Sequence, residues 1–291
     1  MVREGNQRPD IRYTVILILC FGLLTGCSWV QLSYNFADVA LNNRVAAYLL
    51  IDDEDTEHLN TTISVMMGWH RTKMLSKYAV FVQSRAEDVE SGLFSLGQIR
   101  RVVREGRALF AETVEGAAPF VSSVLVRHVS PPKIAYLEAR LAEREAKQMK
   151  IAQLPEDERL KNFSKRWVDY FERFTGPLST EQRNIIRQHG QLDLNRQERW
   201  HGYRAKRRAK FLDLLRRKPS EVHISDFLVT VLNRSEVILG ATYRVYAEEW
   251  WERKIAMCAE VLQSLNADQI TELGINLRSL SDDFRQLSKQ S

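Results

Sequence analysis

The chain has 291 residues, of which 44% are hydrophobic and 27% are charged, and its formal net charge is +5. This composition is ordinary for a globular protein, and the length suffices for one large domain or two small ones. Glycine (13 residues) and proline (7 residues) are scarce, which argues against a β-sandwich or β-barrel that needs a turn about every ten residues.

The N-terminal segment has the pattern of a secretory signal. Three arginines precede an apolar run, Tyr13–Leu24, that is too short to cross about 30 Å of hydrocarbon as a helix but suits a signal peptide. The next residues, Leu24-Thr25-Gly26-Cys27, resemble the lipobox of bacterial lipoproteins. The resemblance implies cleavage between Gly26 and Cys27 and a diacylglycerol lipid on the Cys27 thiol, with no other cofactor. An uncleaved anchor or an ordinary signal peptide is the alternative.

The same resemblance implies a location. In lipoprotein sorting, Asp directly after the lipidated Cys retains the protein in the inner membrane, and here that position is Ser28. We therefore expect a lipid anchor in the outer membrane and a protein body on its periplasmic face. The expected division is a signal peptide (1–26), a lipidated N-terminus with a short tether (27–42) and a single helical domain (43–291).

Cysteine usage constrains how the protein is stabilised. Cys20 would be removed with the signal peptide and Cys27 would carry lipid, so only Cys258 is left. No intramolecular disulfide can then form, even in an oxidising compartment. We expect stability to come from core packing alone.

Several short motifs occur along the chain: Tyr34, Asn35 and Asp38 near the anchor, Trp69, His70 and Arg71 in the next segment, and Trp167 and Gln182 within the stretch from Leu160 to Gln182. Together they resemble an uncharacterised family of Gram-negative lipoproteins. The resemblance implies an all-helical lipoprotein and gives no function.

Apolar residues recur at steps of three or four in three long segments, 55–85, 160–174 and 251–265. This spacing indicates amphipathic helices. Pro155 and the three acids after it suit the first turn of the second segment. The sequence predicts an all-α, multi-helix bundle of about eight to ten amphipathic helices behind the signal peptide. Breaks between helices are expected at 51–55, 92–96, 114–118, 129–132, 154–155, 176–179, 190–194 and 218–220.

Four short motifs mark helix starts. A Ser or Asn is followed three residues later by Gln at Ser95/Gln98, Ser179/Gln182 and Asn266/Gln269, and Ser130 is followed by two prolines. The first three have the capping-box spacing, and proline suits the first helical position. The second and third also look like the Leu-Thr-x-x-Gln element of small helical periplasmic chaperones, so a chaperone interpretation stays open beside the capping one.

A basic stretch, Arg196–Lys218, is the strongest candidate for ligand binding. It has ten Lys or Arg against two acids, and ten minus two gives a local net charge of +8. Such a helix suits an anionic envelope lipid or polymer. Nucleic acid would fit the same charges, but a periplasmic protein does not meet it. The alternative is a solvated face on a helix whose Phe211, Leu212, Leu214 and Leu215 lie in the core. The candidate contacts are Arg199, Arg204, Lys206, Arg207, Arg208 and Lys210.

Other polar groups favour structural roles. No two of the six histidines have the i, i+4 spacing of a helical zinc site, and no metal is expected. His70 lies on an apolar stripe, as a core histidine does. The acids Asp52–Asp55 begin a helix, where they complement its dipole.

The sequence contains no recognisable nucleophile or phosphate-binding motif, so an enzyme is not expected. We predict a membrane-anchored, non-catalytic envelope binding or scaffolding protein, whose protein partner the sequence does not identify. A periplasmic chaperone or stress-sensing module is the alternative. An enzyme would require titratable groups to converge in one pocket.

Overall fold

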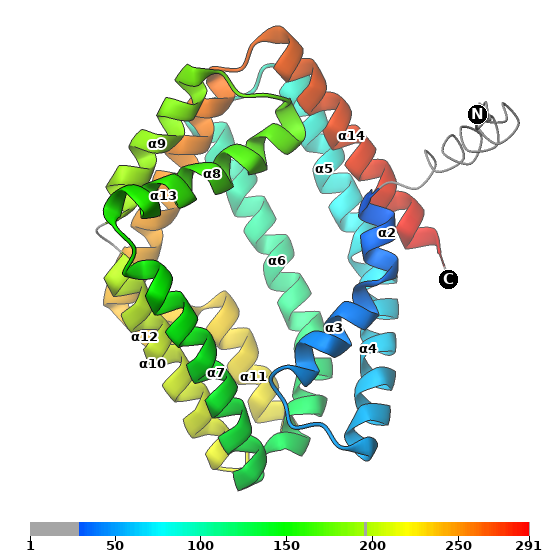
Figure 1. The fold of residues 1–291 in the computed structure, drawn as a ribbon. Coiled ribbons are helices and arrows are strands. Elements are labelled where there is room, and N and C mark those ends of the chain that lie inside the picture. The colour runs from blue at the N-terminus through cyan, green and yellow to red at the C-terminus, as the bar shows by residue number, and fades with distance from the viewer. Residues whose placement is uncertain (1–28, 195–196, 291) are drawn as a thin grey trace, which may run out of the picture. The chain divides into compact units, whose positions relative to one another are not determined.

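The computed structural model describes residues 29–194 and 197–290 (Figure 1). The predicted signal peptide, with Gly26, and the predicted lipidation site Cys27 lie outside these residues. The described residues contain thirteen α-helices, one 3-10 helix and no strand, so the predicted all-α multi-helix fold is confirmed. The helices are α2 (Trp29–Asn35), α3 (Ala37–Ala46), α4 (Asp53–Lys73), α5 (Leu75–Glu90), α6 (Leu96–Leu125), the 3-10 helix η2 (Val126–His128), α7 (Pro131–Ala152), α8 (Glu156–Thr175), α9 (Thr180–Leu194), α10 (Gln197–Arg216), α11 (Glu221–Asn233), α12 (Ser235–Leu239), α13 (Ala241–Gln263) and α14 (Ala267–Lys289).

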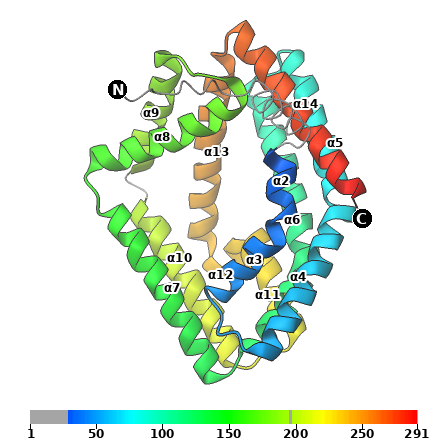
Figure 2. The same cartoon turned by 45° about the vertical axis from the view of Figure 1, so that its right-hand side comes forward.

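The chain divides into two compact units, residues 1–37 and 38–291. Within the second unit, α14 lies along α5, α11 lies along α6, and α8 pairs with α9. Helix α13 contacts α6, α9 and α12, while α10 packs against α7 (Figures 1 and 2). Short helices such as α3 and α12 bring the number above the eight to ten expected.

Four clusters of buried apolar side chains form the core of the second unit. The largest joins α4, α6, α7, α10 and α11 and includes the fully buried Leu215 and Ile224. A second, around Ile186, Met257 and Val261, joins α8, α9 and α13. The core is therefore divided into several clusters, and each cluster holds a different set of helices together.

The four predicted helix starts are confirmed. Ser95 and Asn266 form complete capping boxes at α6 and α14. Ser179 makes the same pair of bonds with Gln182 at α9. Ser130 is the N-cap of α7 without a side-chain bond, and proline follows it, as expected from the sequence.

The break expected at 114–118 is wrong, because α6 continues from Leu96 to Leu125 with Pro119 inside it. Gly116 does not end the helix but makes room for the Trp69 ring of α4, which a Cβ at this position would overlap. Conversely, the periodic segment 55–85 is divided at Met74, where α4 ends and α5 begins.

Among the residues that the structure describes, one helical stretch, Leu96–His128, is long and apolar enough to cross a membrane by length and composition. It consists of α6 and η2, and α6 contacts α4, α5, α11 and α13 within the second unit.

Candidate functional site

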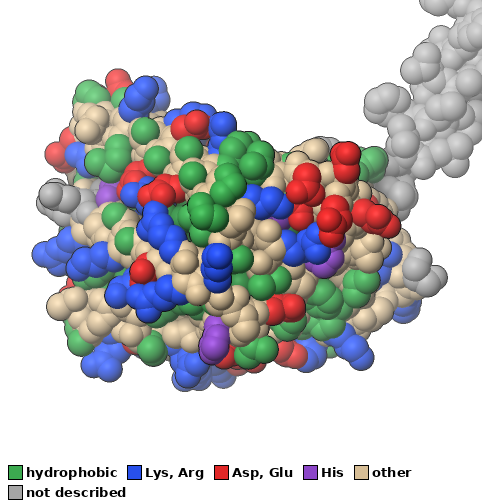
Figure 3. Space-filling view, turned by 90° about the horizontal axis from the view of Figure 1, so that it is seen from below, with side chains coloured by type: hydrophobic (Ala, Val, Ile, Leu, Met, Phe, Trp, Pro, Cys, Tyr) green, Lys and Arg blue, Asp and Glu red, His purple; other side chains and the backbone are tan. Residues whose placement is uncertain are grey.

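The basic stretch folds as α10, with Leu212 and Leu215 buried and Phe211 and Leu214 half-buried. This confirms that one side of the helix belongs to the core. Arg196 lies outside the described residues. Seen from below, Lys and Arg side chains predominate on the side of α7 and α10, whereas acidic side chains gather on the side of α4 (Figure 3).

Part of the positive charge is neutralised within the bundle. Arg208 forms an ion pair with Glu145 of α7. Arg216 pairs with Glu138 of α7 at 2.6 Å. These bonds join α10 to α7, so Arg208, one of the candidate contacts, lies in a structural ion pair.

The remaining candidates differ in their surroundings. Arg207 lies over the Trp200 ring at 5.5 Å from its centroid, and Lys206 lies over Tyr203 at 6.0 Å. Arg199 and Lys210 are exposed. Arg204 is half-buried and lines a cavity.

This first cavity, of about 640 Å³, lies among α7, α8, α9, α10 and α13. From α10 it receives Trp200, His201 and Arg204. Its size is that of a small-molecule site, since such sites measure about 300–1,000 Å³. Aromatic side chains predominate in its lining, namely Phe163, Trp167, Trp200, Tyr243, Tyr246, Trp250 and Trp251.

A second cavity, of about 770 Å³, adjoins the first. Val103, Ile255 and Cys258 form part of its apolar lining. The two cavities share Arg166, Trp167, Trp250, Trp251 and Lys254. We call the two cavities together the aromatic–basic groove.

Lys254 lies where the two cavities meet and is only 6% exposed. Its ammonium lies 4.4 Å from the Phe163 ring centroid, and Trp167 and Trp250 lie at 5.6 and 5.8 Å. Burial lowers the pKa of Lys254, although an ion pair with Asp193 opposes the shift. A cation in contact with three rings is stabilised by their quadrupoles.

Asp193 is the acidic residue of the first cavity, and both its oxygens are occupied. Oδ1 accepts from Arg253 Nε at 2.8 Å, and Oδ2 pairs with Lys254. Its charge is therefore balanced within the protein. The lining as a whole is positive.

Arg204 provides the charge that is not balanced. Burial lowers the pKa of Arg204, and the nearby charges of Arg144 and Arg207 lower it further. Among the described side chains, no carboxylate pairs with it. Burial also lowers the pKa of His201, with a further contribution from Arg204. An anion would relieve this repulsion, because guanidinium binds carboxylate and phosphate through two parallel hydrogen bonds.

Close packing of α8 and α9 places Asp193 beside this cavity. A Cβ at Gly190 would lie 2.7 Å from Phe163 and 2.8 Å from Leu160, so only glycine lets the two helices approach this closely. The start of α8 follows the sequence prediction, with Pro155 as N-cap and acids in the first turn.

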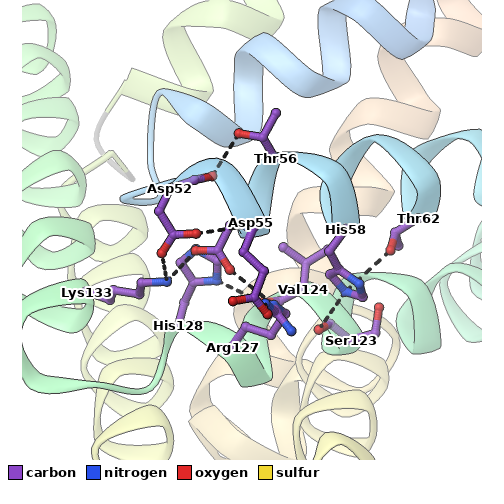
Figure 4. A network of polar contacts seen from close by, with 11 residues as sticks. Asp52, Asp55, Thr56, His58, Thr62, Ser123, Val124, Arg127, His128 and Lys133 are labelled. Atoms are coloured by element: carbon purple, nitrogen blue, oxygen red, sulfur yellow. Dashed lines mark hydrogen bonds and ion pairs between the residues drawn. The ribbon is translucent and has the colours of Figure 1, made fainter.

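A second polar cluster surrounds the N-terminus of α4 (Figure 4). Asp52 caps the helix by accepting from Asp55 N at 2.8 Å. Asp55 is buried and accepts from Arg127 Nε at 3.1 Å and from Lys133. His128 lies 3.4 Å from the same carboxylate and donates through Nδ1 to Val124 O at 2.9 Å.

The Asp55 cluster joins α4 to the segment from η2 to α7. Neither groove cavity is lined by its residues. Spacing at a helix start predicted the capping role of these acids but not the burial of Asp55, because its partners lie more than seventy positions further along the sequence.

The family-like motifs lie in several helices. Tyr34 and Asn35 lie in α2 and Asp38 lies in α3. Trp69 and His70 pack with Phe120 and Tyr78, with ring centroids 6.1 and 5.6 Å apart, and Arg71 follows them in α4. Burial lowers the pKa of His70, consistent with a core histidine. Of these motif residues, Trp167 lines the groove, whereas Gln182 lies in the first turn of α9.

Within the described part of the chain, no group of three or more His, Cys, Asp or Glu residues is arranged to hold a metal. Sequence reasoning named Arg204 but missed Arg166, His201 and Lys254 as its neighbours. The aromatic residues that recur around Trp167 and Trp250 are the sequence signal that could have pointed to this cavity.

The family model described as "Family of unknown function (DUF6279)" matches residues 47–244. This range covers α4 to α12 and includes the part of the groove built from α7, α8, α9 and α10. No curated protein and no solved structure gives a match to the chain.

Proposed function

We propose that this chain, which belongs to the DUF6279 family of unknown function, is a non-catalytic binding protein that takes an anionic ligand in its aromatic–basic groove. We further propose that a lipid on Cys27 holds it at the periplasmic face of the outer membrane. The ligand would be a component of the cell envelope.

The observation that carries the binding role is the position of Arg204. It is a half-buried guanidinium in a ligand-sized cavity, repelled by Arg144 and Arg207 and without a carboxylate partner among the described side chains. A folded protein ordinarily pairs such a charge. A bound anion would supply the pair, and the surrounding rings would cover its apolar part.

The chemistry of the groove supports binding rather than catalysis. Burial raises the pKa of the Cys258 thiol to about 11, so little reactive thiolate forms near neutral pH. The Lys254 ammonium is already engaged by Asp193 and by aromatic rings. Neither group is poised as a nucleophile.

Octyl phosphate is a suitable probe of the binding role. The soluble form, residues 28–291, should bind it saturably below its micelle concentration, as measured by calorimetry and tryptophan fluorescence. Octyltrimethylammonium, with the same chain and a cationic head, should not bind. Because the head is held by charge, affinity should fall as salt is raised.

Arg204→Gln should weaken octyl phosphate binding at least tenfold, since hydrogen bonds between charged groups contribute about 1.5–3 kcal/mol. Lys210→Gln is the matched control: it lies on the same helix, is exposed and does not line the groove. Equal affinities of the two variants, or no binding by the wild type, would overturn the proposed binding role.

The anchor is tested separately. Cys27→Ser should abolish incorporation of radioactive palmitate and leave the precursor uncleaved. The wild type should sediment with outer-membrane markers, as Ser28 suggests. Labelling of the Cys27→Ser variant would exclude lipidation at this residue, and co-fractionation with inner-membrane markers would exclude the proposed location.

A chaperone role is the second candidate, favoured by the length of the groove over two cavities and by its aromatic lining. An extended peptide rich in acidic and aromatic residues would also fit such a surface. If this role is correct, the protein should suppress aggregation of an unfolded model substrate, and octyl phosphate should compete. We expect no suppression.

A further inference from the structure

We infer that the groove accommodates a single-chain anionic amphiphile, with its head beside Arg204 and its hydrocarbon chain extending past the tryptophans into the second cavity. This inference rests on the proposed function and names the ligand class. A long alkyl phosphate or carboxylate has the required chemistry.

The cations of the two cavities differ in burial and in pairing, and this difference orients the ligand. Arg204 and His201 lie in the first cavity alone. In the second cavity, Lys165 is paired with Asp169 at 2.6 Å, and exposed Arg173 accompanies them. The half-buried, unbalanced charge therefore belongs to the first cavity, where the head would lie.

Three tryptophans line the passage between the cavities, together with Arg166 and the buried Lys254. Trp167, Trp250 and Trp251 line both cavities, and the Trp250 and Trp251 rings meet edge to face with centroids 4.8 Å apart. A chain lying across these rings would remain covered along its length. Aromatic surfaces bind hydrocarbon without needing hydrogen bonds.

The far end of the groove suits the end of a chain. Val103 of α6 packs in one apolar cluster with Ile255 and Cys258 of α13, and all three side chains line the second cavity. Ile255 is buried and Cys258 is half-buried. With no polar atom other than a thiol of raised pKa, these three side chains would gain from contact with methylene groups.

Arg166 lines both cavities, so a head group can reach it from the first while the chain occupies the second. Acidic residues within the groove are already paired, Asp193 with Lys254 and Asp169 with Lys165. A zwitterionic or cationic head would meet the same cations without a free acid, and should bind poorly.

A chain-length series tests the inference. Butyl, octyl and dodecyl phosphate carry the same head, and each methylene that becomes buried should raise affinity about three- to fourfold, the equivalent of about 0.8 kcal/mol. Equal affinity for all three would overturn the inference while leaving anion binding intact. Failure of all three to bind would overturn the proposed function as well.

Cys258 reports directly on the second cavity. At pH 9.5, dodecyl phosphate should slow modification of this thiol by methyl methanethiosulfonate at least tenfold, whereas butyl phosphate should leave the rate within twofold. No protection by dodecyl phosphate would overturn the inference. This measurement uses the wild-type side chains, so it does not depend on a variant that folds.

Val103→Trp provides an independent test, because the larger side chain would block the second cavity. It should abolish the preference for dodecyl over butyl phosphate and leave butyl phosphate affinity within twofold. A helical circular dichroism spectrum serves as the folding control. Retained chain-length preference would contradict the inferred path.

Vesicles of phosphatidylglycerol test whether the groove binds a free single-chain amphiphile or the two-chain lipids of a membrane surface. A free single-chain ligand should bind without vesicles and without two-chain lipid. If vesicles bind through Arg204 and dodecyl phosphate does not, the groove recognises a membrane surface and the inference is wrong.

Discussion

Gln182 and Gln269 form a reciprocal pair of buried hydrogen bonds. The Gln182 amide donates to Gln269 Oε1 at 2.8 Å, and the Gln269 amide donates back to Gln182 Oε1 at 3.0 Å. Each amide also donates to a backbone carbonyl of the opposite turn, Ser264 O at 2.9 Å and Pro177 O at 2.8 Å. The pair joins the α8–α9 turn to the α13–α14 turn in a symmetric arrangement.

The same glutamines complete their own capping boxes. Gln182 Oε1 accepts from Ser179 N, and Gln269 Oε1 accepts from Asn266 N. Two helix starts and one contact between turns thus share a single polar network. This accounts for both Leu-x-x-x-Gln elements without a ligand.

We expect Gln182→Ala and Gln269→Ala to lower the free energy of unfolding by about 1–3 kcal/mol each, because each leaves a buried amide without its partner. The double variant should cost less than the sum, since the shared bond is lost only once. Urea denaturation measures all three. Gln98→Ala is the control: it lies in an equivalent capping box near the surface, and about 1 kcal/mol or less is expected. Simple additivity would contradict direct coupling.

The contact between Gly116 and Trp69 predicts a large effect of one methyl group. Gly116→Ala should destabilise the protein by about 1–3 kcal/mol, because the Trp69 ring must move. Gly202→Ala is matched to it, since Gly202 also lies inside a helix but has no heavy atom near its Cβ position. That variant should gain about 0.5–1 kcal/mol. Thermal unfolding measures the change in stability of both variants. Equal changes for Gly116→Ala and Gly202→Ala would contradict the proposed overlap with Trp69.

The Asp55 cluster predicts how stability depends on pH. Burial raises the pKa of this carboxyl, but hydrogen bonds from Lys133 and Arg127 and the charge of His128 outweigh it, so the pKa lies below 3.8. A carboxyl with a lowered folded pKa stabilises the protein above about pH 4 and loses that contribution as pH falls through the folded pKa. Asp55→Asn should remove this contribution to the loss of stability at acidic pH.

At neutral pH, Asp55→Asn should cost about 1–3 kcal/mol, because it weakens the charge-assisted hydrogen bonds that Asp55 accepts from Lys133 and Arg127. Glu54→Gln is the control, since Glu54 also pairs with Arg127 but is exposed, and exposed pairs contribute about 0–1 kcal/mol. Urea titrations from pH 2.5 to 7 separate the two. If the free energy of unfolding of Asp55→Asn falls with decreasing pH as steeply as that of the wild type, other carboxyls determine the acid sensitivity.

Cys258 should be nearly inert in the folded protein. With a pKa of about 11, its thiolate fraction at pH 8 is about two orders of magnitude below that of a free cysteine. Iodoacetamide should therefore react slowly in buffer and rapidly in urea, as followed by mass spectrometry of residues 28–291. Rapid reaction of the folded protein at pH 8 would contradict the burial of this thiol.

The sequence by itself determined the features that depend on residues three or four positions apart. Ser95, Ser179 and Asn266 were identified as helix starts because a capping box is closed within one helical turn. The apolar stripe through Ile255 and Cys258 was identified because its period matches a helix. Long-range contacts changed one such expectation: the break expected around Gly116 is absent, since that glycine admits Trp69 from α4.

Only the tertiary structure decided which charges are available. Arg204 and Arg208 lie one turn apart on α10 with the same local sequence character. Arg208 meets Glu145 of α7, whereas Arg204 faces the cavity. Likewise Asp55 and Gln182 find their partners in segments more than seventy residues away. Ion pairs and cavities depend on which helices pack together, and no local spacing encodes that, so the groove became visible only when α7, α8, α9, α10 and α13 were brought together.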